Sequence, residues 1–162
     1  MYSLIKVMHI GAFMLWLGPA LGSWLVLTYM QRQQGETSTA TYLVYRVFFA
    51  TLVLEHVAFA GLLATGTWLA YSAGWFGSPW LWQKLLLIGA IVIPLEIVDV
   101  LLGNWKAKQW VERRANGLTL SATEQRLLQF YHGGFTKLAL LLLPVTVLLI
   151  MVLAVSKQPV VG

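Results

Sequence analysis

The stretch Met1-Tyr-Ser-Leu-Ile-Lys-Val-Met-His-Ile-Gly-Ala-Phe-Met-Leu-Trp-Leu-Gly-Pro19 opens an apolar run that continues to about Met30. A helix needs about 20 apolar residues to cross a bilayer, whereas the apolar region of a cleavable signal peptide has about 7–15. The run is too long for a signal peptide, so we predict a retained membrane helix. It contains His9. An ionisable side chain is costly in hydrocarbon and is usually kept for a ligand, a proton or a partner.

Three further apolar segments follow, and the whole chain is more apolar than a soluble domain. Of 162 residues, 59% are apolar and 10% are charged, against about 45–50% and about 25% in soluble domains. We predict an all-α membrane protein, a four-transmembrane-helix bundle that forms one integral membrane domain over residues 1–162. The predicted spans are about 3–30, 45–71, 81–102 and 135–156, with a polar cytoplasmic connection at 104–133.

The basic residues indicate topology and lipid contact. The net charge is +5, but the basic residues form no stripe and no RNA-binding motif appears, so we expect no nucleic-acid partner. Arg32 and Arg46 flank the first connection, five basic residues occupy the third, and the second, 72–80, has none. Because cytoplasmic loops are enriched in Lys and Arg, we predict a bacterial inner-membrane protein with both termini outside.

Two patterns predict helix starts in the polar connections. Ser121-Ala-Thr-Glu124 matches a capping box, and Thr37-Ser-Thr-Ala-Thr41 offers several N-cap side chains for a long second helix. The helix from Ser121 would run toward the fourth span, with Gly133-Gly134 as a break. Pro94 falls inside the third apolar run, where a proline frees a backbone carbonyl.

The candidate site begins at His9. A helix rises about 1.5 Å per residue, which puts His9 and Lys84 at similar depth near the outer ends of their spans. Phe13 and Trp16 follow His9 by four and seven residues, so they share its helix face and form an apolar wall for a flat ligand. Two structural alternatives stay open. His9 can bond a neighbouring helix without binding a ligand, and Lys84 can extend its ammonium to the headgroups.

A second polar group lies deeper in the predicted bilayer. Glu55 and His56 are adjacent, and Glu96 and Asp99 are three residues apart and therefore on one helix face. An unpaired carboxylate at this depth costs about 3 kcal/mol on insertion scales. We therefore expect the carboxylates to pair with His56 and Arg46 or to be protonated. The cluster is either a structural lock between helices or a site for protons, a cation or a second cofactor.

The three histidines of the chain are expected at different depths. Two axial ligands must flank one iron at the same level, so we do not expect His9 and His56 to ligate the same haem. His132, at the cytoplasmic end of the fourth span, is expected to be an interfacial residue or a partner of the deeper cluster. Cysteine is absent, which excludes disulfides, iron–sulfur clusters and covalent haem attachment.

Small residues recur on the first span. Gly18 and Gly22 form a small-xxx-small pattern, which lets two helices approach closely in a membrane. The pattern predicts packing within the bundle or a homodimer face.

Two segments carry a resemblance to a known family. Lys6-Val-Met-His9-Ile-Gly-Ala-Phe-Met-Leu-Trp16-Leu-Gly resembles the opening helix of the HemJ-type membrane proteins, and Trp82-Gln-Lys84-Leu-Leu-Leu resembles the start of their third helix. The chain looks still closer to predicted four-helix membrane proteins of unassigned activity, which share the His-Ile-Gly…Trp-Leu-Gly-Pro opening. It departs from the HemJ-type pattern at Pro94-Leu-Glu96, where that family has a Tyr-His pair.

The resemblance implies a haem b protein of the protoporphyrinogen oxidase type. Carried over, it makes His9 an axial ligand of the haem iron and Lys84 a catalytic partner at the haem or substrate. We therefore expect a haem b-binding membrane protein that oxidises a porphyrinogen or transfers electrons to a quinone-like substrate. The alternatives are a proton- or cation-coupled transport or metal-handling protein, built on the deeper cluster, and a non-catalytic membrane subunit.

Overall fold

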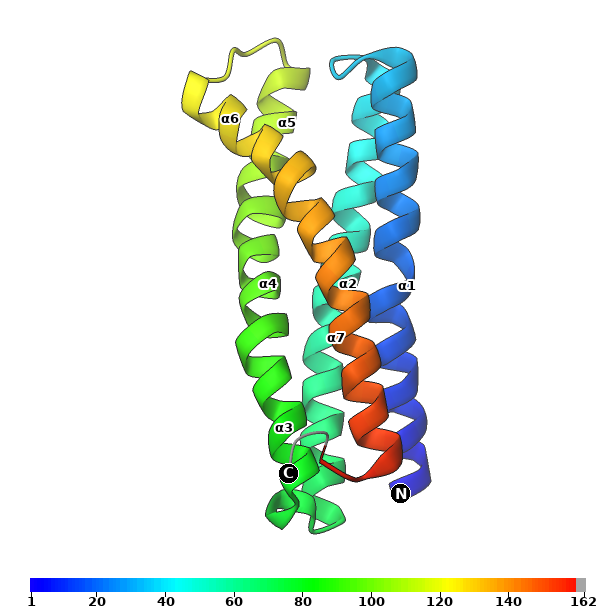
Figure 1. The fold of residues 1–162 in the computed structure, drawn as a ribbon. Helices are drawn as coiled ribbons and strands as arrows, with labels where there is room; N and C mark the ends of the chain where they lie inside the picture. Colours follow the sequence, from blue (N-terminus) through cyan, green and yellow to red (C-terminus); the bar gives the residue numbers. More distant parts are fainter. Residues whose placement is uncertain (160–162) are drawn as a thin grey trace.

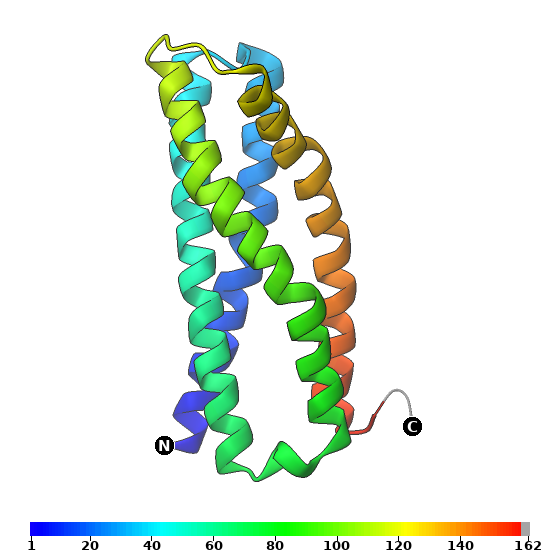
Figure 2. The same ribbon diagram turned by 90° about the vertical axis from the view of Figure 1, so that its left-hand side faces the viewer.

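The computed structural model describes residues 1–159, and every regular element in them is helical. Four long rods stand side by side (Figures 1 and 2), and each is long and apolar enough to cross a membrane. The predicted all-α four-helix membrane bundle is confirmed. The rods are α1 (Tyr2–Gln34), α2 (Thr39–Ser72), a third built from α3 (Pro79–Leu87), α4 (Ile93–Val98) and α5 (Lys108–Ala115), and a fourth built from α6 (Ala122–Phe130) and α7 (Thr136–Ser156).

The rods run further than the predicted spans. Residues 104–133, expected as one polar connection, are helical on both sides of a short link at 116–121. The N-terminus, the end of α7 and the α2–α3 connection, which contains the 3₁₀ turn Trp75–Gly77, lie at one end of the bundle (Figure 1). The α1–α2 and α5–α6 connections lie at the opposite end.

Both predicted caps are present at that opposite end. The Ser38 side chain accepts a hydrogen bond from the Thr41 backbone N–H, at 3.1 Å. Ser121 and Glu124 form the complete capping box: the Ser121 hydroxyl accepts from the Glu124 N–H at 3.2 Å, and the Glu124 carboxylate accepts from the Ser121 N–H at 2.8 Å. Each cap satisfies backbone donors that the first helical turn leaves free.

Wider π-helical turns interrupt the third and fourth rods without breaking them. One, Ile88–Val92, lies just before Pro94, and a second covers Asp99–Ala107. The third, Tyr131–Phe135, contains Gly133 and Gly134. The glycine pair was expected to break the helix, but the chain continues through it, because a π turn needs only one extra residue in the hydrogen-bonded ring.

The rods pack against one another through three hydrophobic cores. Many apolar side chains outside these cores face outward. The cores lie near the capped end, at mid-height and near the termini, and they are built around Phe48, Trp16 and Leu153 respectively. Many outward-facing residues are Leu and Val, with Leu148 62% exposed, as expected for a surface in contact with lipid. Gly18 and Gly22 are also exposed, and a Cβ added at either meets no atom within 4 Å. The Gly18/Gly22 pair is therefore not used for packing within the chain.

Candidate functional site

The His9 cavity lies between the terminal-end halves of the rods. It holds about 750 Å³ of unfilled space, open mouth included. The cavity is lined by all four predicted site residues of the first and third spans: His9, Phe13, Trp16 and Lys84. The depth estimate that put His9 level with Lys84 agrees with this arrangement. Most of the remaining lining is aliphatic or aromatic.

The imidazole of His9 is held against α2 by two neighbouring residues. His9 Nδ1 lies 2.9 Å from the Thr65 hydroxyl, which itself donates to the Gly61 carbonyl at 2.7 Å. Because the hydroxyl has one hydrogen and that hydrogen is directed at Gly61, Thr65 accepts from the Nδ1–H of His9. His9 is thereby in the tautomer whose Nε2 carries the free lone pair.

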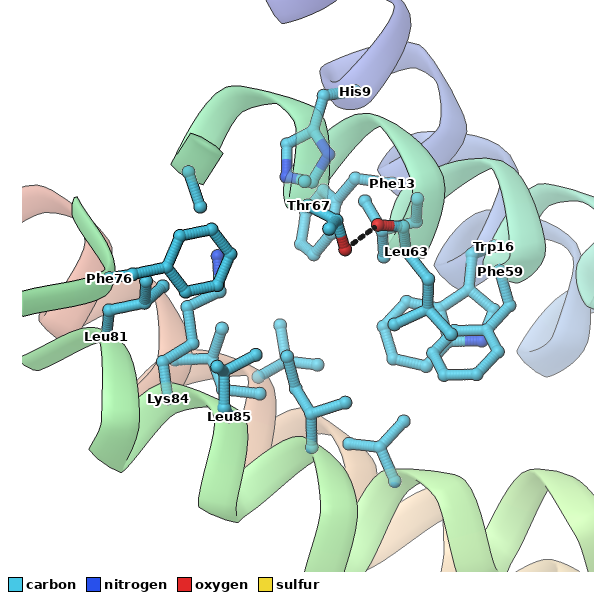
Figure 3. A pocket seen from close by; sticks show the side chains of 17 residues that line it. His9, Phe13, Trp16, Phe59, Leu63, Thr67, Phe76, Leu81, Lys84 and Leu85 are labelled. Atoms are coloured by element: carbon cyan, nitrogen blue, oxygen red, sulfur yellow. Dashed lines mark hydrogen bonds between the residues drawn. The ribbon is translucent and has the colours of Figure 1, made fainter. Parts of the chain in front are cut away.

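Gly66 provides the surface on which the ring rests. A Cβ built on Gly66 would lie 3.0 Å from His9 Cε1, closer than ordinary van der Waals contact, and 3.6 Å from Nδ1. The opposite edge of the ring faces the cavity (Figure 3). The ring is therefore fixed on one side and available on the other.

Lys84 points its amino group into the same cavity, beside Phe76 and on the opposite wall from His9 (Figure 3). No carboxylate pairs with it among residues 1–159. Extension of this side chain to the headgroups is therefore not the conformation observed. An unpaired ammonium in an apolar cavity favours an anionic ligand group, because transfer from water leaves its charge uncompensated.

The predicted deeper cluster forms a connected network between α1, α2, the third rod and the fourth. His56 Nδ1 lies 2.9 Å from Glu96 Oε2, and its Nε2 lies 3.6 Å from Asp99 Oδ2, an ion-pair distance that is too long for a hydrogen bond. Trp16 Nε1 donates to Glu96 Oε1 at 2.7 Å, and the Tyr131 hydroxyl donates to Asp99 Oδ1 at 2.6 Å. The predicted pairing of the carboxylates with His56 holds for Glu96 and Asp99.

The remaining acid, Glu55, has no such partner. Its side chain is 6% exposed, and its Oε1 has no hydrogen bond within the described chain. Arg46, expected to pair with the cluster, is exposed and lines a separate depression with Lys108 and Glu112. That expectation was wrong, because the backbone directs residue 46 away from the face that carries Glu55.

His132 is not a partner of the deeper cluster. It packs against the rings of Tyr45, Phe48 and Tyr131 at centroid distances of 5.3, 5.9 and 5.0 Å. Neither ring nitrogen has a hydrogen-bond partner within residues 1–159. His132 is therefore an aromatic packing residue in the structure, and it is separate from both His9 and His56.

Sequence reasoning missed the residues that orient the site. Thr65 and Gly66 carry no signal in the sequence because a threonine and a glycine are common in apolar helices. The Trp16–Glu96 and Tyr131–Asp99 bonds were missed because each joins residues on different rods, 80 and 32 positions apart in the sequence. Within residues 1–159, no three His, Cys, Asp or Glu side chains form a group that could hold a metal ion. No family model, curated protein or solved structure matches the chain.

Proposed function

We propose that this chain is an integral membrane haem b-binding protein in which His9 ligates the iron from within the His9 cavity. The observation that carries the proposal is the fixed imidazole: Nδ1 bonds Thr65 at 2.9 Å and Nε2 faces the cavity. Histidines that ligate metals in proteins usually donate their other ring N–H to a nearby oxygen, which sets the tautomer and the ring orientation. The same arrangement leaves the His9 lone pair free.

The rest of the lining fits a flat, apolar group with acidic substituents. Phe13, Trp16 and Phe59 provide aromatic walls, and Lys84 supplies one positive charge for a carboxylate. Lys84 is also the residue that would bind an anionic porphyrin substrate. The resemblance of the opening helix to the HemJ-type proteins points to the same ligand.

When bound, haem supplies one-electron redox chemistry, whose potential depends on the axial ligand and on burial. The residues of this chain would hold it, exclude water and position an acidic substrate. Among the described residues that line the cavity there is no second histidine and no methionine, so His9 is expected to be the one strong protein ligand. We place the protein in a bacterial inner membrane on the basis of its charge pattern.

The test is absorption spectroscopy of protein purified after growth with added haem precursor. We expect a Soret band and a positive pyridine haemochrome assay for the wild type. His9→Ala should lose most of the haem, since it removes the iron ligand, and Thr65→Val should lower the affinity by about 10–100-fold, as loss of a supporting hydrogen bond does at metal sites.

His132→Phe is the matched control. It removes another histidine but keeps an aromatic ring among Tyr45, Phe48 and Tyr131, so its haem content should equal that of the wild type. Absence of a Soret band in the wild type after haem supply would rule out the proposal. A band that is unchanged in His9→Ala would rule out His9 as the ligand.

A further inference from the structure

A second cavity, the Glu55 cavity, lies on the other side of Trp16. It holds about 1,090 Å³ of unfilled space including its mouth, and its lining comes from all four rods. Trp16 lines both cavities and separates them, with its indole N–H bonded to Glu96. The Glu55 cavity is therefore a distinct site and not an extension of the His9 cavity.

The charges on its walls are of one sign. Glu55, Glu96 and Asp99 are part of the lining, and none of the described lining residues is a Lys, Arg or His. Glu96 and Asp99 already accept hydrogen bonds from His56, Trp16 and Tyr131. Glu55 is the acid left over, more than nine-tenths buried, with Oε1 lacking a hydrogen-bond partner.

The remaining walls are aromatic and aliphatic. Trp16, Trp24, Phe48, Tyr131 and Phe135 surround the acids. Aromatic faces attract cations through their quadrupole, most strongly when water is excluded. A carboxylate within such walls fits a cation that is itself largely apolar better than it fits a small hydrated ion, for which the structure has no compact ligand group within residues 1–159.

The α1 and α7 walls of the cavity favour entry from the bilayer. Its lining includes Leu17 and Leu21 of α1 and Leu140 and Leu143 of α7, and Leu21 is 50% exposed. Leu21 faces the hydrocarbon region if the rods cross the membrane, and the other three leucines are half-buried beside it. A lipophilic ligand would reach the cavity between α1 and α7 without leaving the membrane.

We propose that the Glu55 cavity binds a lipophilic organic cation, with the Glu55 carboxylate as its counter-ion and the indole and phenyl rings as its walls. This site is independent of haem binding at His9. Glu96 and Asp99 hold the network that shapes the cavity, while Glu55 provides the charge for the ligand.

The probe is tetraphenylphosphonium, compared with tetraphenylborate, which has nearly the same size and shape but the opposite charge. Binding to the purified full-length protein in nanodiscs of zwitterionic lipid is measured by equilibrium dialysis. We expect saturable binding of the phosphonium and none of the borate. The chain has a net charge of +5, so non-specific electrostatic attraction would favour the borate instead.

Glu55→Gln should weaken phosphonium binding by about thirtyfold or more, the scale expected when one partner of a buried charge pair is removed. Glu112→Gln makes the same chemical change outside the cavity and should bind as the wild type does. His9→Ala should also bind as the wild type does, which separates this proposal from the haem proposal. Leu140→Phe, which fills the cavity without changing its charge, should weaken binding even if Glu55→Gln fails to fold.

Equal binding of the two probes by the wild type would overturn the proposal, as would wild-type affinity in a folded Glu55→Gln variant. Absence of phosphonium binding to the wild type would overturn it as well.

Discussion

At the scale of single residues, the orientation of His9 depends on its neighbours on α2. The Thr65 hydroxyl directs the Nδ1–H, and the missing side chain of Gly66 makes room for the ring. A histidine in an apolar helix without these two neighbours would be free to rotate to another partner. The pair Thr65–Gly66 therefore fixes the orientation of a polar side chain that is costly in hydrocarbon.

The clearance over Gly66 gives a direct prediction. In Gly66→Ala, the added Cβ would lie 3.0 Å from His9 Cε1, so the ring must shift by a few tenths of an ångström from the position in which Thr65 holds it. We expect haem affinity to fall by about tenfold or more, as for other losses of support around a metal ligand, measured by haem titration of the apoprotein.

Gly61→Ala is the control for this change. It lies on the same helix, but its added Cβ would meet only Ala12 Cβ, at 3.9 Å, which is ordinary contact. Alanine in place of glycine within a helix stabilises it by about 0.5–1 kcal/mol, so Gly61→Ala should bind haem normally and melt slightly higher. Equal haem affinity in the two variants would contradict the role given to Gly66.

At the scale of elements, the π turns place polar residues at the bundle interior. A π turn adds one residue to the hydrogen-bonded ring and so shifts the faces of the helix before it relative to those after it. In the fourth rod, Tyr131–Phe135 forms such a turn. Its first residue, Tyr131, is 1% exposed and donates to Asp99.

The hydroxyl of Thr136 stabilises this turn. It donates to the Tyr131 carbonyl at 2.6 Å, which compensates for the irregular backbone bonding of the π turn. Thr136→Val keeps the shape but removes the donor, and we expect a loss of about 1 kcal/mol of stability, measured by reversible unfolding in detergent. Thr136→Ser keeps the hydroxyl and should be close to wild type. Equal stability of the two variants would show that the bond contributes nothing.

At the scale of the whole molecule, the two ends of the bundle differ in their charged residues. Arg113 pairs with Glu124 and Arg114 with Glu36, each at 2.6 Å, and both pairs lie at the end with the α1–α2 and α5–α6 connections. The opposite end carries aromatic contacts, including Lys157 over the Trp75 ring at 4.8 Å. The two cavities lie between these ends, on either side of Trp16.

The difference between the two ends predicts which end of the bundle faces the cytoplasm. The chain has no cysteine, so a single introduced thiol is the one site for a maleimide. By the positive-inside rule, Gly77→Cys should react with a membrane-impermeant maleimide added to intact spheroplasts, and Leu118→Cys should react only after lysis. The reverse pattern would place the termini in the cytoplasm, and labelling of both thiols in intact spheroplasts would contradict a four-span bundle.

Much of the fold followed from local patterns, whereas only part of the site did. The four rods and both caps were predicted from apolar run length and from Ser121–Glu124 and Thr37–Thr41. The shared position of His9, Lys84, Phe13 and Trp16 followed from helical rise and periodicity. The pairing expected for Arg46 was wrong, because residue 46 points away from the helix face that carries Glu55. The break expected at Gly133-Gly134 was wrong because a π turn carries the helix through the pair. Of the two places left open for His132, partnership with the deeper cluster is not observed, because its ring packs among Tyr45, Phe48 and Tyr131.

The sequence by itself determined that the chain forms membrane-length helices, which residues are costly in hydrocarbon and at what level along the helices they lie, because hydrophobicity and helical rise are local properties. The tertiary structure decided which of these residues have partners. Thr65 and Gly66 leave His9 fixed and open, Trp16 divides two cavities, and Glu55 stays without a hydrogen-bond partner while Glu96 and Asp99 are bonded. These relations join residues from different rods, and only the packing of the rods brings them within bonding distance.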